Sequence, residues 1–332
     1  MTGTSQLVLV LLLFVLSGGI AMSVDNLDEF PLDFNFVKSP TGQLIQLETH
    51  RLHLDCRGEG SVTVLLEAGL GGVSLEWDPV QQILARRTRT CSYDRAGYGW
   101  SDPSPFPRDA RQLAREADAM LRAADIGGPL LLVGHSFGGF VIRELHRRRK
   151  KDVIGMVLVD SSHEDQFRQM ESSDSKPMMP RGKNFVISPV GVPENLPLDI
   201  RKKIAAFSRM RKTYSATHSE MTWFRQSAEQ VRRGRKVLDI PVTVLQRGLN
   251  PYAEAGISSR DIAGSSIKSR VDVKDDAVDR NEQWNDLQAN LVLLSGQGRL
   301  VVAEQSGHHI HSDEPELVAA IVEEMLDDYE KP

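Results

Sequence analysis

The chain has 332 residues, of which 26% are charged, and its formal net charge is −5. This composition is typical of a folded soluble protein and excludes a low-complexity chain or a polycation that coats nucleic acid, so no nucleic-acid partner is expected. At about 150 residues per domain the length suggests two domains, but α/β units of about 250 residues often fold as one.

The first predicted element is an unbroken apolar run, "LVLVLLLFVL", at residues 7–16. Two glycines and a short Ala-Met-Ser segment follow it, which is the order found in a secretory signal peptide. A membrane anchor needs about 20 apolar residues, and this run reaches that length only by including glycines and serines. No lysine or arginine precedes Lys38. We predict that residues 1–23 are a signal peptide or, alternatively, an uncleaved anchor, with the protein secreted or membrane-anchored outside the cytoplasm; a run with neither role is the third alternative.

From residue 43 the sequence alternates between predicted strands and helices, which are separated by turn-forming residues. In chain order they are a strand pair at 43–56, a strand at 62–69, a helix at 75–87, a strand at 88–94, a helix at 108–126, a strand at 129–134, a helix that ends near Arg149, and a strand at 152–160. The strand "PLLLVG" is apolar without alternation, as expected for a strand that is buried on both faces of a parallel sheet.

The only two cysteines, Cys56 and Cys91, lie near the ends of predicted strands in the same half of the chain. An oxidising compartment would allow them to form a disulfide, and the alternative is two buried thiols. The sequence has no Cys-x-x-Cys, no His-Glu-x-x-His and no dense acidic loop, so no metal ion is expected.

Residues 164–239 interrupt the alternation with a polar, proline-rich stretch and two helical segments near 198–215 and 219–236. The alternation then resumes with a strand at 240–248, a helix at 280–295, a strand at 298–305 and a helix at 315–330. Strands that alternate with helices predict an α/β fold with a mostly parallel sheet and helices on both faces. We therefore expect residues 24–332 to form a single domain with an insertion at about 164–239.

The most informative motif is "GHSFGG" at residues 134–139, where a buried strand ends and a helical pattern begins. Small residues around a single hydroxyl pack poorly and are poor helix formers, so this break in the apolar run favours a functional role. A Gly-x-Ser-x-Gly pattern at such a junction is a nucleophile elbow, which presents Ser136 above the carboxyl ends of the strands. The alternative is a glycine-rich turn whose serine has no role.

A serine hydroxyl needs a base that removes its proton during attack. The segment "SGHHIHSDEPELV" places three histidines, His308, His309 and His311, between the last predicted strand and the last helix. His308 follows Gly307, which gives the turn room to point the ring inward, so His308 is the predicted base and His309 is the second candidate. Histidines in such a loop are otherwise solvated polar residues.

The third member of a Ser-His-acid triad orients the imidazole and stabilises its cation. In the chain order Ser, acid, His, this acid lies between Ser136 and His308 at the carboxyl end of a strand. Asp160 directly follows the apolar strand residues "MVLV", whereas the next strand ends in "LQRG" without an acid. Asp160 is therefore the predicted acid and Asp261 in the later loop is its competitor; an aspartate at a strand end otherwise caps the next turn.

Acyl chemistry also needs two hydrogen-bond donors where negative charge develops on the carbonyl oxygen. The amide of Phe137, directly after the nucleophile, is one predicted donor. The loop "EAGLGG" after an earlier strand supplies the other, for which we favour the amide of Leu70. A phosphate-binding loop is the alternative, but the segment lacks both the Gly-x-Gly-x-x-Gly spacing and a Lys-Ser/Thr ending.

Taken together, four segments resemble the α/β-hydrolase superfamily of esterases, lipases and aminopeptidases. They are "EAGLGG" at 67–72, "YDRAGYGWSDP" at 93–103, "GHSFGG" at 134–139 and "SGHHIHSDEPELV" at 306–318. The resemblance extends from residue 43 to 328 and implies an α/β-hydrolase fold in which Asp94 and Arg95 hold a loop. The commonest family pattern places the acid after the later strand, so the resemblance implies the alternative placement at Asp160. A serine nucleophile argues against the dehalogenase and epoxide-hydrolase branches, which need a carboxylate at that position.

In this family, an insertion at 164–239 is a cap over the active site. From Leu198 to Lys236 it carries eleven basic and three acidic residues. Such a surface docks on an anionic membrane or favours a negatively charged substrate, and the alternative is two solvated helix faces. Aromatic and methionine residues of the insertion, including Met210 and Phe224, either line an apolar acyl pocket or pack the cap on the sheet.

The predicted function is a serine hydrolase that cleaves a small-molecule carboxylic ester, or less readily an amide, through an acyl-enzyme intermediate and without a cofactor. One alternative is a non-catalytic α/β-hydrolase fold that serves as a ligand receptor, although such a module has no use for a buried proton relay. The other is an acyltransferase that uses the same triad. The sequence makes no prediction about acyl chain length or oligomeric state.

Overall fold

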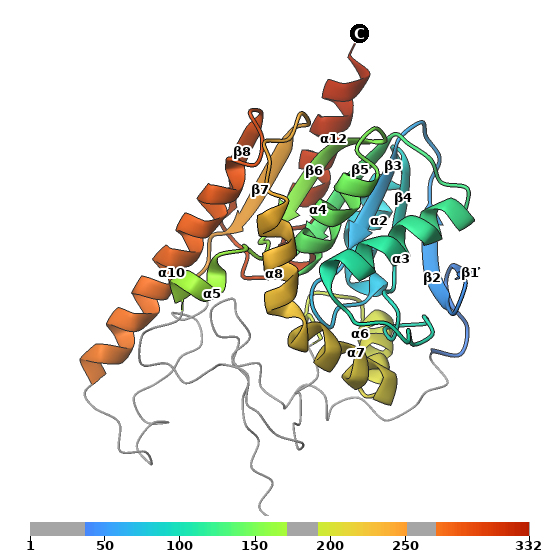
Figure 1. The fold of residues 1–332 in the computed structure, drawn as a ribbon, viewed down its shortest axis with the longest axis horizontal. Coiled ribbons are helices and arrows are strands. Elements are labelled where there is room, and N and C mark those ends of the chain that lie inside the picture. The colour runs from blue at the N-terminus through green and yellow to red at the C-terminus, as the bar shows by residue number, and fades with distance from the viewer. Residues whose placement is uncertain (1–36, 171–191, 251–269, 332) are drawn as a thin grey trace, which may run out of the picture.

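The described residues form one mixed sheet of eight strands that is covered by helices (Figure 1). The computed structural model describes residues 37–170, 192–250 and 270–331, so the predicted signal peptide or anchor at 1–23 lies outside the described residues. The strands are, in chain order, β1 (Gln43–Gln46), β2 (Arg51–Arg57), β3 (Thr63–Glu67), β4 (Arg89–Tyr93), β5 (Leu130–His135), β6 (Val153–Val159), β7 (Val242–Arg247) and β8 (Gly298–Ala303). Across the sheet they lie in the order β1-β2-β4-β3-β5-β6-β7-β8.

Most neighbouring strands run parallel, which confirms the predicted fold class. The pairs β1–β2 and β2–β4 are antiparallel, and the other five pairs are parallel. The carboxyl ends of β3 to β8 therefore meet at one edge of the sheet. Ligands of open α/β sheets bind at this edge, and it is where Ser136 and Asp160 directly follow their strands.

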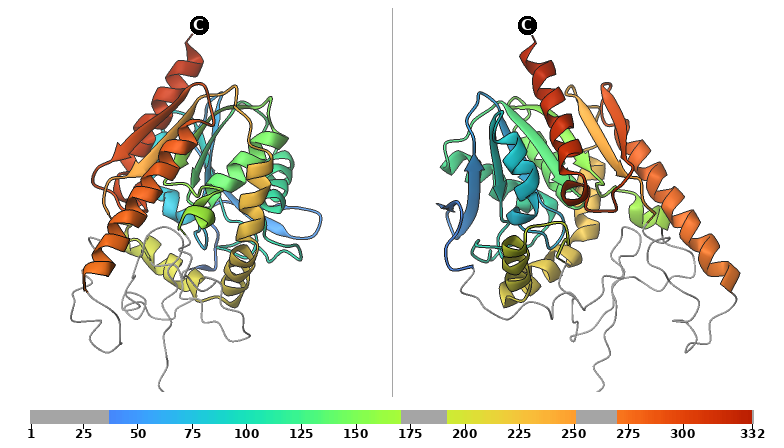
Figure 2. Two further views of the ribbon diagram at one scale, coloured as in Figure 1. Left: turned by 60° about the vertical axis from the view of Figure 1, so that its left-hand side comes forward. Right: turned by 180° about the vertical axis from the view of Figure 1, so that it is seen from behind.

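Helices cover both faces of the sheet. In chain order the helices of the described residues are η2 (Ser74–Trp77), α2 (Asp78–Leu84), α3 (Ala110–Ala123), α4 (Gly138–Arg148), α5 (Gln166–Met170), α6 (Leu198–Ser208), α7 (Arg211–Thr222), α8 (Phe224–Arg233), α10 (Arg270–Val292), α11 (Ile310–Asp313) and α12 (Pro315–Glu330). The front view shows α3, α4, α8 and α10 on one face, and the view from behind shows α2 and α12 on the other (Figures 1 and 2). Within the described residues, no helix combines the length and apolarity needed to cross a bilayer.

The core is divided by the sheet into two apolar clusters, one on each face. Strand β5 contributes Leu130 and Leu132 to the first cluster and Leu131 and Val133 to the second. This alternation explains the apolar run in the sequence, because every residue of β5 is buried whichever face it points to. Each fully buried leucine contributes about 2 kcal/mol, so the strand that carries the elbow is anchored firmly.

The two cysteines form a disulfide between neighbouring strands. Cys56 of β2 lies opposite Cys91 of β4 in the antiparallel register, and their sulfurs are bonded. The sequence left this pairing open. The bond closes a loop of 35 residues, which corresponds to about 4 kcal/mol of stabilisation in the chain-entropy model.

The insertion between β6 and β7 contains α5, α6, α7 and α8 in its described part, and its residues 171–191 lie outside the described residues. Helices α6 and α7 lie beyond the carboxyl edge of the sheet (Figure 1). Ile200 and Phe207 of α6 form an apolar cluster with Leu75 and Tyr98, which belong to segments that follow β3 and β4. The ring of Phe224 in α8 lies 5.1 Å from that of Phe137, so this aromatic residue packs the insertion on the main core.

Part of the positive charge in the insertion is already bound to other groups. Lys212 Nζ donates to the carbonyl oxygen of Gly99 at 2.7 Å, and Arg235 Nη1 contacts the carboxylate of Glu164 at 3.1 Å. The formal charge of this segment therefore overstates the charge that remains available for a membrane or an anionic substrate.

Candidate active site

Ser136 occupies a strained turn between β5 and α4. Its φ of +50° lies in the left-handed region, which costs a non-glycine residue about 1–3 kcal/mol. The turn is held by the amide of Ser136, which donates to Val159 O at 3.0 Å, and by its carbonyl oxygen, which accepts from the Ser162 amide at 3.0 Å. A Cβ at Gly138 would lie 2.6 Å from Ala68 O, so only glycine allows α4 to begin this close to the end of β3. These features are those of a nucleophile elbow.

Asp160 is fully buried at the end of β6 and also has a positive φ, of +38°. Its Oδ2 lies 2.6 Å from His308 Nδ1 and accepts from Arg247 Nη1 at 2.9 Å, while Oδ1 accepts from Trp284 Nε1 at 2.8 Å. Burial by itself raises the pKa of this carboxyl, but the charge of Arg247 and the hydrogen bond with His308 outweigh it and lower the pKa to about 2. Asp160 is therefore a carboxylate at neutral pH, and the predicted acid and base are brought together.

His308 lies near the turn at Ser136 and binds Asp160 through one ring nitrogen. A ring that donates Nδ1–H to a carboxylate has its lone pair on Nε2, which is the tautomer a general base needs. The carbonyl oxygen of His308 lies 2.9 Å from His135 Nε2, and the two rings are 4.6 Å apart, so the base lies beside the neighbour of Ser136. Among the described residues, Ser136 Oγ makes no hydrogen bond with His308, whose ring nitrogen Nδ1 is bound to Asp160. Such bonds often tighten only when substrate is bound.

The structure bears differently on the alternative base, His309, and on the alternative acid, Asp261. His309, the second candidate base, makes no hydrogen bond with Asp160 in the described part of the chain; its ring instead faces His135 and His311, at 5.3 and 5.9 Å. Asp261, the competing acid, lies outside the described residues.

The loop after β3 lies against the elbow and is held there by Arg95. A Cβ at Gly69 would lie 3.3 Å from Ser136 Cβ, which shows how near this loop comes. The buried guanidinium of Arg95 donates to Ala68 O and to Gly69 O, both at 2.7 Å. In a planar trans peptide the C=O and the following N–H point in opposite directions, so the N–H of Leu70 points away from Arg95. Neither the Leu70 nor the Phe137 amide has a hydrogen-bond partner among the described residues, which leaves two free donors near Ser136.

The same guanidinium joins three parts of the chain. It binds Glu67 at the end of β3 at 2.6 Å and Glu220 of α7 at 2.9 Å through both Nε and Nη2. The neighbouring Asp94 accepts from the Ser74 amide at 2.7 Å. Asp94 and Arg95 thus hold loops by buried hydrogen bonds, as the resemblance implied.

With this geometry in place, the comparison with known proteins is decisive at the level of family. The model of the alpha/beta hydrolase family matches residues 64–321. The chain belongs to the α/β hydrolase family. Its relatives include the uncharacterized protein YqjL of Bacillus subtilis (strain 168), which is 27% identical over 263 residues that cover 79% of this chain and 82% of that protein.

Solved structures with the same fold include an epoxide hydrolase, CorEH, with a TM-score of 0.60 and 16% identity over 87% of this chain and 99% of that chain. Another is CarC, a serine hydrolase involved in carbazole degradation, with a TM-score of 0.58 and 16% identity over the same shares. At these identities the likeness shows the fold alone.

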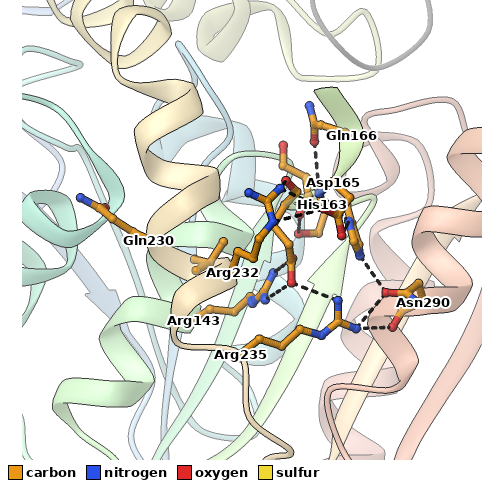
Figure 3. A network of polar contacts seen from close by, with 12 residues as sticks. Arg143, His163, Asp165, Gln166, Gln230, Arg232, Arg235 and Asn290 are labelled. Atoms are coloured by element: carbon orange, nitrogen blue, oxygen red, sulfur yellow. Dashed lines mark hydrogen bonds and ion pairs between the residues drawn. The ribbon is translucent and has the colours of Figure 1, made fainter. Parts of the chain in front are cut away.

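The loop of this α/β hydrolase that follows β6 is fixed by a buried polar network (Figure 3). The carboxylate of Glu164 accepts from Arg143 of α4 at 2.7 Å and from Arg235 at 3.1 Å. His163 Nε2 lies 3.0 Å from Asn290 Oδ1 of α10. Burial alone would raise the pKa of Glu164, but Arg143 holds it well below its usual range. The loop that carries the candidate acid is therefore tied to α4, to α10 and to the segment after α8.

Sequence reasoning missed two partners of Asp160. The end of β7 was not considered for the acid because it contains no acidic residue. The basic residue there, Arg247, is the fully buried ion-pair partner of Asp160. Parallel strands place their carboxyl ends side by side, so an arginine at the end of the neighbouring strand was an available signal. Trp284 of α10 had no such signal, because its contact depends on how that helix packs on the sheet.

Proposed function

We propose that this α/β hydrolase is a serine hydrolase that cleaves a small-molecule carboxylic ester through an acyl-enzyme intermediate. The observation that carries the proposal is the 2.6 Å contact between His308 Nδ1 and Asp160 Oδ2, beside the strained turn that presents Ser136. A carboxylate that is fully buried beside an imidazole would be a costly way merely to stabilise the fold. It is the arrangement that a proton relay requires.

In the proposed reaction, Ser136 Oγ attacks the carbonyl carbon of the ester while its proton passes to His308 Nε2. Negative charge on the carbonyl oxygen is stabilised by the free amides of Leu70 and Phe137. The tetrahedral intermediate then collapses, the C–O bond to the alcohol breaks, and His308 returns the proton to the leaving alkoxide. Water next attacks the acyl-enzyme with His308 as base, which releases the carboxylic acid and regenerates Ser136. Asp160 stays ionised throughout and stabilises the imidazolium.

Arg95 is a positioning residue in this scheme. Because its guanidinium fixes the carbonyl oxygens of Ala68 and Gly69, it orients the peptide that carries the Leu70 N–H. A donor that is already oriented needs no reorganisation when the charge develops, and this preorganisation is the main source of electrostatic stabilisation in such sites.

Where the protein acts is part of the same proposal. We infer that it is secreted or membrane-anchored with its catalytic domain outside the cytoplasm, on the basis of the apolar run at 7–16. The Cys56–Cys91 disulfide supports this, because structural disulfides persist in oxidising compartments and are rare in the cytosol.

The test uses a fluorophosphonate probe, which labels an activated serine, and a panel of chromogenic esters and aminoacyl amides of graded acyl length. We expect labelling and ester turnover in the wild type, and loss of both in Ser136→Ala and His308→Gln. The matched control is Ser215→Ala, which removes an exposed hydroxyl on α7 and leaves both readouts intact. Equal labelling of wild type and Ser136→Ala would refute the assignment of the nucleophile. Product analysis with an added alcohol separates hydrolysis from acyl transfer.

A further inference from the structure

Three histidines outside the proposed triad form a cluster beneath it. His135 ends β5, His309 precedes α11, and His311 lies within α11. The ring centres of His135 and His311 are 4.4 Å apart, and those of His135 and His309 are 5.3 Å apart. His135 and His311 are buried and His309 is half-buried. One ring nitrogen from each residue lies within 4.8 Å of the other two.

These rings contain buried nitrogens without hydrogen-bond partners among the described residues: Nδ1 of His135, Nδ1 of His309 and both nitrogens of His311. A buried polar group that is left unpaired costs about 1–3 kcal/mol, so several in one place need an explanation. His135 Nε2 faces His308 O at 2.9 Å and must carry the hydrogen, because a carbonyl oxygen only accepts. The lone pair of His135 is therefore on Nδ1. Metal-binding histidines have this arrangement, with one nitrogen bonded to a carbonyl or carboxylate and the other bare.

The spacing of the rings fits an ion with modest adjustment. An ion about 2.1 Å from three imidazole nitrogens holds the ring centres roughly 4.6–5.6 Å apart. The closest and widest pairs here are 4.4 and 5.9 Å. A Cβ at Gly69 would lie 2.8 Å from His135 Nδ1, so a side chain at residue 69 would press against that ring. Glu76 Oε2 lies 3.9 Å from His311 Nε2, which places a carboxyl group on one side of that ring.

We propose that His135, His309 and His311 form a binding site for a divalent transition-metal ion of the zinc type. Three imidazole ligands with a fourth position for water or an anion are a common zinc set, whereas Mg²⁺ and Ca²⁺ prefer oxygen ligands. No metal ion was expected from the sequence, because it contains none of the familiar metal-ligand motifs. These three ligands come from two segments far apart in the chain, so no spacing motif joins them.

Occupancy of this site affects the neighbouring chemistry, a consequence that rests on the proposed function. Ligand nitrogens around one ion lie about 3.0–3.6 Å apart, so binding draws the end of β5 towards the loop at 307–311. That loop carries His308, and the end of β5 leads into Ser136. We therefore expect a bound ion to lower turnover reversibly without occupying the position of the substrate carbonyl.

The binding test is independent of catalysis. The full-length chain, prepared without a polyhistidine tag, is dialysed against micromolar Zn²⁺ or Mg²⁺, and bound metal is measured per chain. We expect one Zn²⁺ and no Mg²⁺ in the wild type. His311→Asn and His309→Gln should each weaken Zn²⁺ binding at least about tenfold, since even the loss of an outer partner of a ligand costs that much. His218→Asn, which removes an exposed imidazole on α7, should bind as the wild type does.

Failure of the folded wild-type chain to bind Zn²⁺ would overturn the proposal and indicate that the three rings only pack together. Binding that is equal in the wild type and in both variants, each shown to be folded by circular dichroism, would place the ion elsewhere and overturn it too. If a variant does not fold, Co²⁺ bound to the wild type decides: tetrahedral visible bands support the site and octahedral bands contradict it. Zn²⁺ should also lower ester turnover in the wild type but not in His311→Asn relative to its own zinc-free rate. Since dialysis needs no turnover, the site can stand even if the proposed hydrolase activity fails.

Discussion

Replacing Arg95 by lysine tests whether one buried guanidinium orients the donors near Ser136. Arg95 makes hydrogen bonds to two carbonyl oxygens and to the carboxylates of Glu67 and Glu220, and all three charged side chains are buried. A lysine keeps the charge but has only three donors on one nitrogen, so at least two of these acceptors lose their partner. At about 1–3 kcal/mol for each unsatisfied group, we expect Arg95→Lys to lower the free energy of unfolding by about 2–6 kcal/mol.

The effect of Arg95→Lys on catalysis is separate from its effect on stability. If Gly69 O is released, the peptide can rotate and the Leu70 N–H no longer points at the developing oxyanion. Loss of one such donor lowers kcat by about 10²–10³, while KM changes little because the ground-state carbonyl depends on it less. Steady-state kinetics on a chromogenic ester give kcat and KM, and urea unfolding gives the stability.

The matched control for this prediction is Glu220→Gln, which weakens the ion pair with α7 but keeps both carbonyl contacts of Arg95. It should lose stability and retain a kcat close to that of the wild type. If Arg95→Lys and Glu220→Gln reduce kcat equally, or if Arg95→Lys loses stability with kcat unchanged, then Arg95 does not orient the Leu70 peptide.

Three further predictions concern the acid and the disulfide. Asp160→Asn should reduce kcat by about 10⁴ at pH 7, because the asparagine NH2 can donate to His308 Nδ1 and so favour the wrong tautomer, and because its neutral side chain does not stabilise the imidazolium; steady-state rates near the wild-type value would contradict this. Arg247→Met should raise the pKa of Asp160, which is about 2 in the wild type. In the wild type this lowered pKa corresponds to about 2 kcal/mol of stability, which is present above about pH 4 and is lost as the pH falls towards 2. Denaturant unfolding should therefore show a stability difference between Arg247→Met and wild type that is largest above pH 4 and shrinks towards pH 2, and a constant difference would exclude this linkage. The double variant Cys56→Ala/Cys91→Ala should have a free energy of unfolding about 4 kcal/mol lower than that of the wild type. Dithiothreitol should destabilise the wild type by the same amount and should leave the double variant unaffected.

Local sequence patterns were sufficient for the sheet and for the turn at Ser136. Strands such as β5 can be recognised in the sequence as continuous apolar runs, because they are buried on both faces. The glycines around Ser136 indicate a close approach between backbone segments that no other residue allows. Asp160 and His308 could be chosen because strand ends in a parallel sheet share one edge. The contact between them is present in the structure, although the pattern alone gave no distance.

Partners that act through packing could not be predicted in this way. Arg247 stabilises Asp160 from the neighbouring strand, and Trp284 does so from a helix whose sequence gives no sign of its orientation. Glu220 reaches Arg95 across 125 residues of chain, so no motif contains both. The cluster of His135 and His311 was missed for the same reason, because these residues come from two distant segments and no motif contains both.

The two positive-φ residues at adjacent strand ends, Ser136 and Asp160, explain why the site forms at this edge. Successive residues of an extended strand point to opposite faces of the sheet, so a continued β5 and β6 would direct both side chains into the first core cluster, which contains Leu132 and Leu158. A left-handed residue ends that alternation at each strand, and the carboxylate of Asp160 then reaches His308 Nδ1 at 2.6 Å. The strain of about 1–3 kcal/mol at each position persists because neighbouring strands hold the turns: the Ser136 amide donates to Val159 O, and the Asp160 amide donates to Leu245 O. The parallel sheet thus fixes the positions of the turns that carry Ser136 and Asp160, and the carboxylate of Asp160 in turn holds the imidazole of His308.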